Sequence, residues 1–204
     1  MAFWAVLDTS VLYPMPLCDA LLWIASTDLY QPLWSEEILD ELRRNVSKKV
    51  PDADIDWRID QMTAAFPEAM VEGYESLTPS MTNDVKDRHV LAAAVVGRAQ
   101  VIVTNNLDDF PEEACAPFGI EPQDADQFLL HCFDLDFDRT VLALVRQADS
   151  KHNPPVSLED LLDLLAEEPV APRFAAQARE HVDARLAEDP AFLGAIRERA
   201  FDLP

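Results

Sequence analysis

The stretch QVIVTNNLDDF, residues 100–110, decides the fold class of this chain. Its first part, QVIVT (100–104), is the short apolar run typical of a strand buried on both faces of a parallel sheet, and a polar run follows at once. Residues 2–7 (AFWAVL) have the same character and end at Asp8. Both segments therefore predict buried strands of a parallel sheet, each followed by polar side chains.

Weaker strand patterns and clear helical patterns alternate with these two strands. The weaker strands are predicted at 29–34, 69–72 and 119–121. The helices are predicted at 36–46, around 57–62, from the stretch NDVKDRHVLAAAV (83–95), and at 124–133. Pro32 removes a ladder donor from one strand, and Ser35 is the expected cap of a helix. The alternation predicts an α/β fold with an open parallel sheet flanked by helices.

The last third of the chain shows helical patterns alone. They lie at 136–150, 157–167, 172–187 and 190–200. Ser157 is a suitable cap after the turn HNPPVS. We expect two domains, an α/β domain at 1–133 and an all-helical C-terminal extension at 134–204.

The charge of the chain is strongly negative and unevenly distributed. The net charge is −22, of which −15 falls in residues 1–133 and −7 in residues 134–204. This charge argues against loose electrostatic binding to nucleic acid, which basic patches normally supply. It favours a cationic partner or a bound metal ion, and it places that cation in the α/β part.

Other features of composition exclude several classes of protein. No run approaches the roughly 18 to 20 apolar residues that span a bilayer, and the N-terminus lacks the basic region of a signal peptide. The three cysteines, at 18, 115 and 132, show no CxxC spacing, and the four histidines show no zinc-site spacing. We expect a cytoplasmic protein with reduced, mostly buried thiols and no membrane association.

Acidic and amide side chains follow the predicted strands. Ligands of open parallel sheets bind beyond the carboxyl ends of the strands, so these side chains should converge if the strands are neighbours. The candidates are Asp8, Asp84, Asp87, Asn105, Asn106, Asp108 and Asp109. Asp84 or Asp87 taken alone is more typical of a helix cap, and Thr9 or Ser10 equally suits a cap or a metal-binding hydroxyl. Glu41 flanks the apolar face of its helix, where a glutamate points either outward or into a site.

Several carboxylates in one pocket repel one another. Two unit charges about 4 Å apart cost about 4 kcal/mol at an effective dielectric constant of about 20. Proton sharing or a divalent cation removes this cost. Oxygen ligands without histidine or cysteine suit Mg²⁺ or Mn²⁺. Such an ion can activate water against a phosphodiester.

Five motifs in chain order resemble a PIN domain, closest to the VapC-like toxins of bacterial toxin–antitoxin pairs. They are LDTSVL (7–12), SEEILDEL (35–42), KDRHVLAAAV (86–95), VTNNLDDFP (103–111) and IEPQDADQFLL (120–130). The resemblance covers residues 1–133. It implies a five-stranded parallel sheet, a Mg²⁺- or Mn²⁺-dependent ribonuclease site, an RNA substrate, a cognate antitoxin protein and a homodimer.

The resemblance also implies roles for single residues. The catalytic positions map onto Asp8, Glu41, Asp87 and Asn106, and the metal ligands onto Asp8, Glu41 and Asp87. The family often has aspartate where this chain has Asn106, which contributes an oxygen without a charge. We therefore expect either a single ion or a second ion that binds weakly. The expected auxiliary residues are Asp84, a cap or outer neighbour, Thr104 and Asp109.

The basic stretch RRNVSKK (43–49) continues the helix that carries Glu41. The candidate contacts for substrate phosphates are Arg43, Arg44, Lys48, Lys49 and Arg88. A solvated helix end is the equal alternative for the cations of this stretch.

Two other functions remain open from the sequence. A phosphohydrolase of the HAD type would need aspartate where this chain has Ser10. A PIN-like module that binds nucleic acid or protein without cutting is the other, since Asn106 departs from the family pattern.

Overall fold

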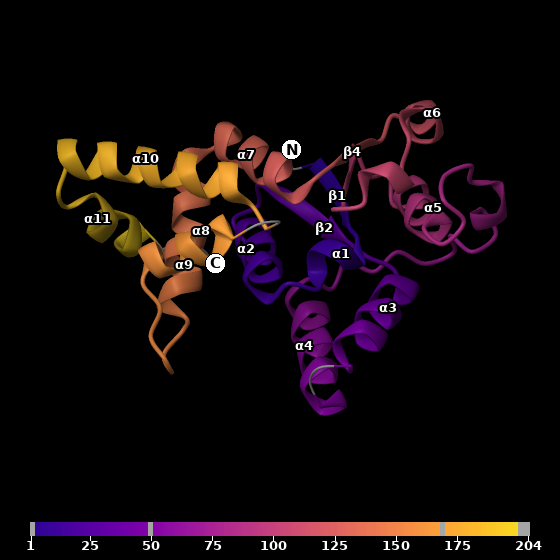
Figure 1. Cartoon of the computed structure of the whole chain (residues 1–204), viewed down its shortest axis with the longest axis horizontal. Helices are drawn as coiled ribbons and strands as arrows, with labels where there is room; N and C mark the ends of the chain where they lie inside the picture. Colours follow the sequence, from indigo (N-terminus) through magenta and orange to yellow (C-terminus); the bar gives the residue numbers. More distant parts are fainter. Residues whose placement is uncertain (1–2, 49–50, 168–169, 200–204) are drawn as a thin grey trace. The chain divides into compact units, whose positions relative to one another are not determined.

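The structure is a computed structural model that describes residues 3–48, 51–167 and 170–199 (Figure 1). The chain forms two compact units. The first comprises residues 1–14 and 30–124, and the second comprises residues 15–29 and 125–204. The predicted domains, 1–133 and 134–204, stay a prediction. Each unit is described below by itself.

The first unit contains a parallel sheet with the strand order β2-β1-β3-β4. Its strands are β1 (Phe3–Leu7), β2 (Tyr30–Leu33), β3 (Val101–Val103) and β4 (Glu121–Gln123). Val6 pairs with Leu33 on one side and with Ile102 on the other, so β1 and β3 are neighbours. All three residues of β3 are buried, as its apolar run predicts. The predicted α/β fold with an open parallel sheet is confirmed.

Two strand predictions need correction. The resemblance implies five strands, but the described residues form four, because segment 69–72 makes only one parallel bridge, from Trp34 to Met70. Gly73 follows that bridge with a φ of 77°, which turns the chain away from extended geometry. The strand predicted at 119–121 begins later, because Gly119 has a φ of 68° and ends a 3₁₀ turn.

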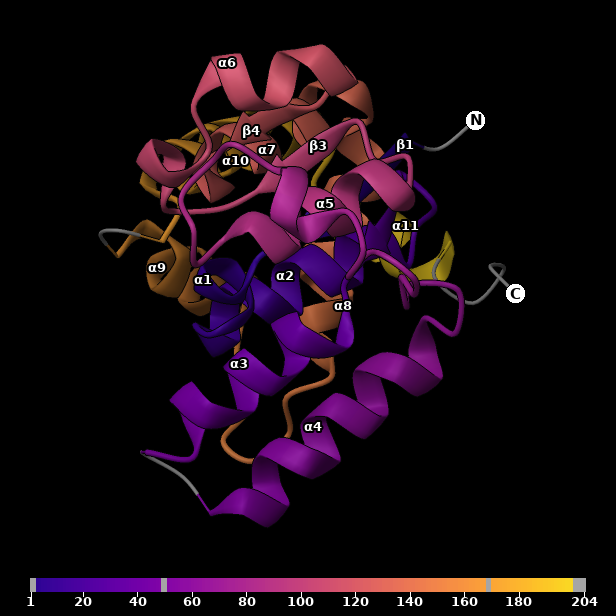
Figure 2. The same cartoon turned by 90° about the vertical axis from the view of Figure 1, so that its right-hand side faces the viewer.

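Helices of the first unit cover the sheet and hold its polar strand ends. They are α1 (Thr9–Leu12), α3 (Glu36–Val46), α4 (Asp52–Ala65), α5 (Arg88–Val96) and α6 (Glu112–Cys115). Short 3₁₀ turns lie at Thr78–Ser80, Leu107–Asp109 and Ala116–Phe118. Figure 2 shows α3 and α4 side by side. The side chain of the buried Arg58, on α4, donates a hydrogen bond to the carbonyl of Leu12 and so ties α4 to α1.

Two caps differ from expectation. The cap of α1 is Asp8 rather than Thr9 or Ser10, because the Asp8 carboxylate accepts a hydrogen bond from the Ser10 amide. The helix predicted from residue 83 begins at Arg88, because residues 83–87 form turns, in which Asp84 Oδ1 accepts a hydrogen bond from the Lys86 amide. Ser35 caps α3 as predicted.

The end of α5 packs closely enough to forbid a larger residue at Gly97. A Cβ atom there would lie 2.7 Å from Leu33 Cδ1 and 3.0 Å from Val71 Cγ2. We expect Gly97→Ala to lower the free energy of unfolding by about 1–3 kcal/mol. Gly194→Ala is the control, since a Cβ there meets no atom within 4 Å and the change should slightly stabilise the helix Phe192–Arg199. Urea denaturation measures both, and equal effects would contradict this packing.

The second unit contains helices and no named strand among its described residues. Its helices are α2 (Met15–Ala25), α7 (Ala125–Leu135), α8 (Phe137–Asp149), α9 (Leu158–Ala166), α10 (Pro172–Glu188) and α11 (Phe192–Arg199). The predicted helical extension is confirmed, and α2 packs against α8. Ser157 caps α9 through a reciprocal capping box with Asp160.

None of the described helices is both long and apolar enough to cross a membrane. Cys18, Cys115 and Cys132 are buried free thiols, as expected.

Candidate functional site

One cavity of the first unit collects the predicted catalytic residues. It has a volume of about 360 Å³. Its lining residues are Asp8, Thr9, Ser10, Tyr13, Glu41, Asn45, Lys48, Asp87 and Asn106. Four separate segments therefore supply the four predicted positions: the end of β1, the middle of α3, the start of α5 and the segment after β3. Since β1 and β3 are parallel neighbours, their carboxyl ends meet at this edge of the sheet.

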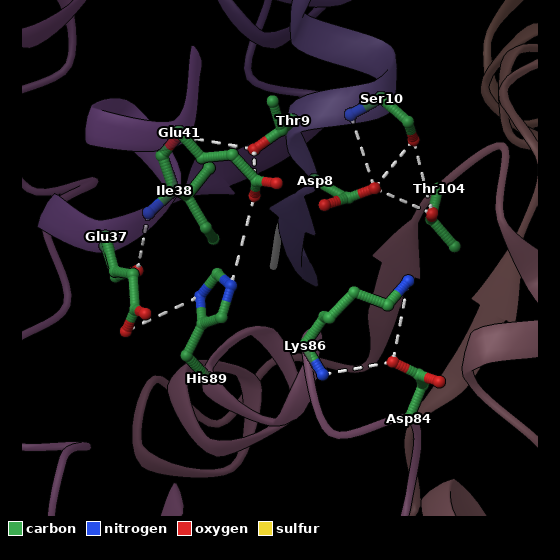
Figure 3. Close-up of polar contacts among 11 residues, drawn as sticks. Asp8, Thr9, Ser10, Glu37, Ile38, Glu41, Asp84, Lys86, His89 and Thr104 are labelled. Atoms are coloured by element: carbon green, nitrogen blue, oxygen red, sulfur yellow. Dashed lines mark hydrogen bonds and ion pairs between the residues drawn. The ribbon is translucent and has the colours of Figure 1, made fainter. Parts of the chain in front are cut away.

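Asp8 is fixed by hydroxyl groups on one of its two oxygens. It is 3% exposed, and its Oδ2 accepts hydrogen bonds from Ser10 Oγ at 2.6 Å and from Thr104 Oγ1 at 2.8 Å (Figure 3). The Ser10 amide adds a bond of 3.3 Å to the same oxygen. Asp8 Oδ1 accepts no hydrogen bond from the part of the chain that the structure describes. This arrangement orients the carboxylate and leaves Oδ1 for a ligand.

Glu41 is held from two sides. Its Oε2 accepts a hydrogen bond of 3.0 Å from Thr9 Oγ1 and lies 4.0 Å from Nε2 of the buried His89. The other ring nitrogen, Nδ1, lies 4.0 Å from Oε2 of Glu37, one turn before Glu41 on α3 (Figure 3). These contacts and the lining of the cavity favour the inward orientation of Glu41 over the outward one.

The carboxyl group of Asp87 has an unusually high pKa. The pKa of its carboxyl is raised from 3.8 to about 7, mainly by burial. The charges of Asp8 and Asp109 and a hydrogen bond with Asp109 contribute to that rise, while Lys86 opposes it. Near neutral pH the side chain therefore exchanges between its protonated and ionised forms when nothing compensates the negative charge around it.

A second group of carboxylates surrounds Asp87 on its other side. One oxygen from each of Asp84, Asp87 and Asp109 lies within 4.8 Å of the other two. The Asp84 amide also donates a hydrogen bond of 3.1 Å to the carbonyl of Asp109. The predicted auxiliary residues Asp84 and Asp109 thus accompany Asp87, whereas Thr104 accompanies Asp8.

Most of the predicted phosphate contacts do not line the cavity. Arg43 is engaged by Asp40 at 2.5 Å and by Asp56 at 2.7 Å, and the hydrogen bond with Asp56 is the main reason that the pKa of Arg43 is raised. Arg88 Nε donates a bond of 3.3 Å to the carbonyl of Asn83. Arg43, Arg44 and Arg88 are not among the residues that line the cavity, and Lys49 lies outside the described residues.

Comparison with known proteins decides the family. A sequence model of the PIN domain matches residues 5–108, just over half of the chain. This chain belongs to the PIN domain family. A model of the VapC50 C-terminal domain matches residues 125–180, so the relationship extends beyond residue 133. No solved structure gives a significant match.

A curated relative supports the same branch of the PIN family. "Putative ribonuclease VapC50" of Mycobacterium tuberculosis (strain ATCC 25618 / H37Rv) is 45% identical to this chain over 111 residues. The match covers 54% of this chain and 64% of the relative's length. The predicted resemblance to VapC-like PIN domains is confirmed.

Sequence reasoning missed several residues of this PIN site. Ser10 was expected as a cap or a metal-binding hydroxyl, but its side chain donates to Asp8. His89, which faces two glutamates of α3, was not predicted. Asn45 was not predicted either, although it follows Glu41 by four residues and helical spacing could have placed it on the same face. Lys48, a predicted phosphate contact, does line the cavity. No comparable pattern marks Tyr13, which comes directly after α1.

The pKa of Asp87 predicts how the stability of the metal-free PIN site depends on pH. The folded chain binds this proton more tightly than the unfolded chain does, so the folded state is favoured at low pH. The stability from this group is therefore lost as pH rises from about 4 to about 7. In EDTA, we expect Asp87→Asn to flatten the fall in melting temperature between about pH 5 and pH 8. Identical melting profiles for the variant and the wild type would contradict the assignment.

Proposed function

We propose that this chain is a divalent-metal-dependent endoribonuclease and the toxin of a bacterial toxin–antitoxin pair. The observation that carries the proposal is the convergence of Asp8, Glu41, Asp87 and Asn106 on one cavity from four segments of the chain. The 45% identity to a relative named as a ribonuclease supports the reaction class.

The donor set of the cavity suits Mg²⁺ or Mn²⁺. Asp8, Glu41 and Asp87 offer carboxylate oxygens, and Asn106 offers an amide oxygen, which are the ligands that such ions prefer. The pKa of Asp87 is raised mainly by burial and further by the charges of Asp8 and Asp109, which a bound cation would compensate. We assign Asp8, Glu41 and Asp87 as the residues that would hold the ion.

When bound, a divalent cation supplies Lewis-acid chemistry, which draws charge from the scissile phosphodiester and acidifies water. The chain's own groups supply position. Ser10 and Thr104 orient Asp8, and Thr9 orients Glu41. In the hydrolysis, the oxygen of water bonds to phosphorus while one phosphorus–oxygen ester bond breaks. We assign Glu41 the further role of accepting the proton from water, through the carboxylate oxygen that does not hold the ion, and the leaving oxygen takes a proton from solvent.

Asn106 reduces the charge available to a second ion. An aspartate at this position would add a carboxylate, whereas the amide adds only an uncharged oxygen. We propose one tightly bound ion and, at most, a more weakly bound second one. Asp109 lies beside Asp87 and supplies charge on that side of the site.

The proposed partner is a basic segment of an antitoxin protein, since the net charge of −22 suits a cationic surface. A homodimer and a cytoplasmic location are part of the same proposal. The affinity of the antitoxin complex should fall as the salt concentration rises. A complex whose affinity does not change with salt would contradict the electrostatic part of this proposal.

The direct experiment incubates the purified chain with total cellular RNA in Mg²⁺ or Mn²⁺, beside an EDTA control. Cleavage that requires the ion supports the proposal. A folded chain that binds metal and RNA but cuts neither total RNA nor single-stranded oligonucleotides would favour the alternative, a PIN-like module that binds nucleic acid or protein without cutting. This alternative is retained because Asn106 departs from the family pattern. The alternative of a HAD-type phosphohydrolase is disfavoured. That class needs a second aspartate where this chain has Ser10, and the Ser10 side chain donates a hydrogen bond to Asp8.

A further inference from the structure

One wall of the cavity carries three side chains of different chemistry. Glu41, Asn45 and Lys48 follow one another at intervals of four and three residues along α3 and its first following turn, so they share a face. Tyr13 lines the same cavity directly after α1, where its amide donates to the carbonyl of Thr9. An acid, an amide, a cation and an aromatic ring thus border one space.

Lys48 is distinctive among the cations of the first unit. Of the described lysines and arginines, it alone lines the cavity. Its Nζ donates a hydrogen bond of 3.0 Å to Oδ1 of Asn45, which directs the ammonium along the cavity wall. Arg43, by contrast, is bound between Asp40 and Asp56 and points its charge into those carboxylates.

An anionic polymer such as RNA needs a cation of this kind in order to bind, because the cavity and the chain are acidic. The cavity contains Asp8, Glu41 and Asp87, and the chain as a whole is strongly acidic. A polyanion is repelled by this charge unless a nearby cation binds its phosphates. The exposed Lys48 lies on the rim of the acidic site and is free to meet a phosphate next to the one that is cut.

We infer that Lys48, positioned by Asn45, binds a phosphate of the RNA strand adjacent to the scissile one, and that Tyr13 supplies an aromatic face for an unpaired base beside it. This inference rests on the proposed ribonuclease function and assigns its substrate contacts. Aromatic faces hold unpaired bases of any sequence, whereas a base in a duplex is covered by its neighbours. The subsite therefore takes a single-stranded segment.

The test compares Lys48→Met with Arg98→Met. Arg98 is exposed and belongs to the same unit, so the control removes the same charge without touching the cavity. With a fluorogenic single-stranded RNA oligonucleotide in Mn²⁺, we expect Lys48→Met to raise KM about tenfold with kcat nearly unchanged. Arg98→Met should leave both values within about twofold.

A binding measurement gives a readout independent of cleavage. The dissociation constant of a labelled RNA oligonucleotide is measured in EDTA at several salt concentrations. Lys48→Met should reduce the slope of log affinity against log salt by about 1, which is the loss of one phosphate contact. Arg98→Met should leave the slope nearly unchanged.

Tyr13 is tested with two substitutions that keep most of its volume. Tyr13→Phe retains the aromatic face and should leave KM nearly unchanged, while Tyr13→Leu loses it and should raise KM about tenfold. Thermal melts identify any variant that fails to fold, and Tyr13→Met takes the place of Tyr13→Leu if the latter does not fold. A tenfold rise in KM for Tyr13→Phe would show that the hydroxyl, not the ring, makes the contact. An unchanged KM for the folded variant without a ring would overturn the aromatic contact.

The outcomes separate this inference from the function on which it rests. Equal effects of Lys48→Met and Arg98→Met on KM and salt slope, with an active wild type, would overturn the subsite and leave the ribonuclease proposal standing. A folded wild type that neither cuts nor binds RNA would overturn both.

Discussion

Replacing Asp87 by asparagine should lower kcat/KM for RNA cleavage by at least about 100-fold. Removing an outer partner of a metal ligand typically costs about 10- to 100-fold, and removing a direct ligand costs more. The variant keeps the size of the side chain and loses its charge. It also removes the repulsion from Asp8 and Asp109 that raises the pKa of Asp87. The metal-free variant should therefore melt at least as high as the wild type near pH 8.

Asp84→Asn is the matched control for this experiment. It makes the same change three residues earlier, within the carboxylate group of Asp84, Asp87 and Asp109. We expect its effect on kcat/KM to stay below about tenfold, because Asp84 does not line the cavity. Comparable losses in the two variants would mean that the ion binds the Asp84–Asp87–Asp109 group instead. An active, folded Asp87→Asn enzyme would contradict the assignment of Asp87 altogether.

The largest expected loss of stability lies in the second unit, at Asp126. The helix α10 has no side-chain cap of its own, since Ala171 holds the N-cap position. Asp126, on α7, accepts hydrogen bonds from the Phe174 amide at 2.7 Å and from the Arg173 amide at 3.1 Å. The Arg173 guanidinium adds a bond of 2.7 Å. The carboxylate thus performs the capping role from a neighbouring helix.

Asp126→Ala should lower the free energy of unfolding by about 3 kcal/mol. The substitution leaves the amide donors of α10 without a partner in a largely buried place, which costs about 1–3 kcal/mol for each unsatisfied group. Asp134→Ala, which removes a 3.4 Å contact with Gln177 at the surface, should cost less than about 1 kcal/mol. Denaturant unfolding measures both, and equal losses would show that Asp126 does not hold α10 to α7.

Much of the fold could be predicted because it depends on local apolar runs. The strands β1 and β3 are continuous apolar segments, and the parallel order brings the polar groups that follow them together. For the same reason the amino-acid sequence alone was enough to place Asp8 and Asn106 at one site. Ser157 and Ser35 were recognisable as caps because capping depends on residues only three apart.

The rest depends on contacts between distant segments. The missing fifth strand follows from the single bridge between Trp34 and Met70, which no apolar pattern reveals. The pKa of Asp87 depends in part on Asp109, more than twenty residues away. The choice between Arg43 and Lys48 as a substrate contact required knowing that Asp56 holds Arg43. Ion pairs between distant residues produce no periodic pattern in a sequence, so they could not be predicted from it.

Anomalous scattering from a crystal soaked in Mn²⁺ tests most directly whether the Asp8–Glu41–Asp87 cavity is the metal centre. We predict a strong manganese peak at about 2.0–2.3 Å from Asp8 Oδ1 and from a carboxylate oxygen of Asp87, absent from crystals of Asp87→Asn. A peak held by Asp84 and Asp109 without Asp8, or no peak in this cavity at saturating Mn²⁺, would contradict the account.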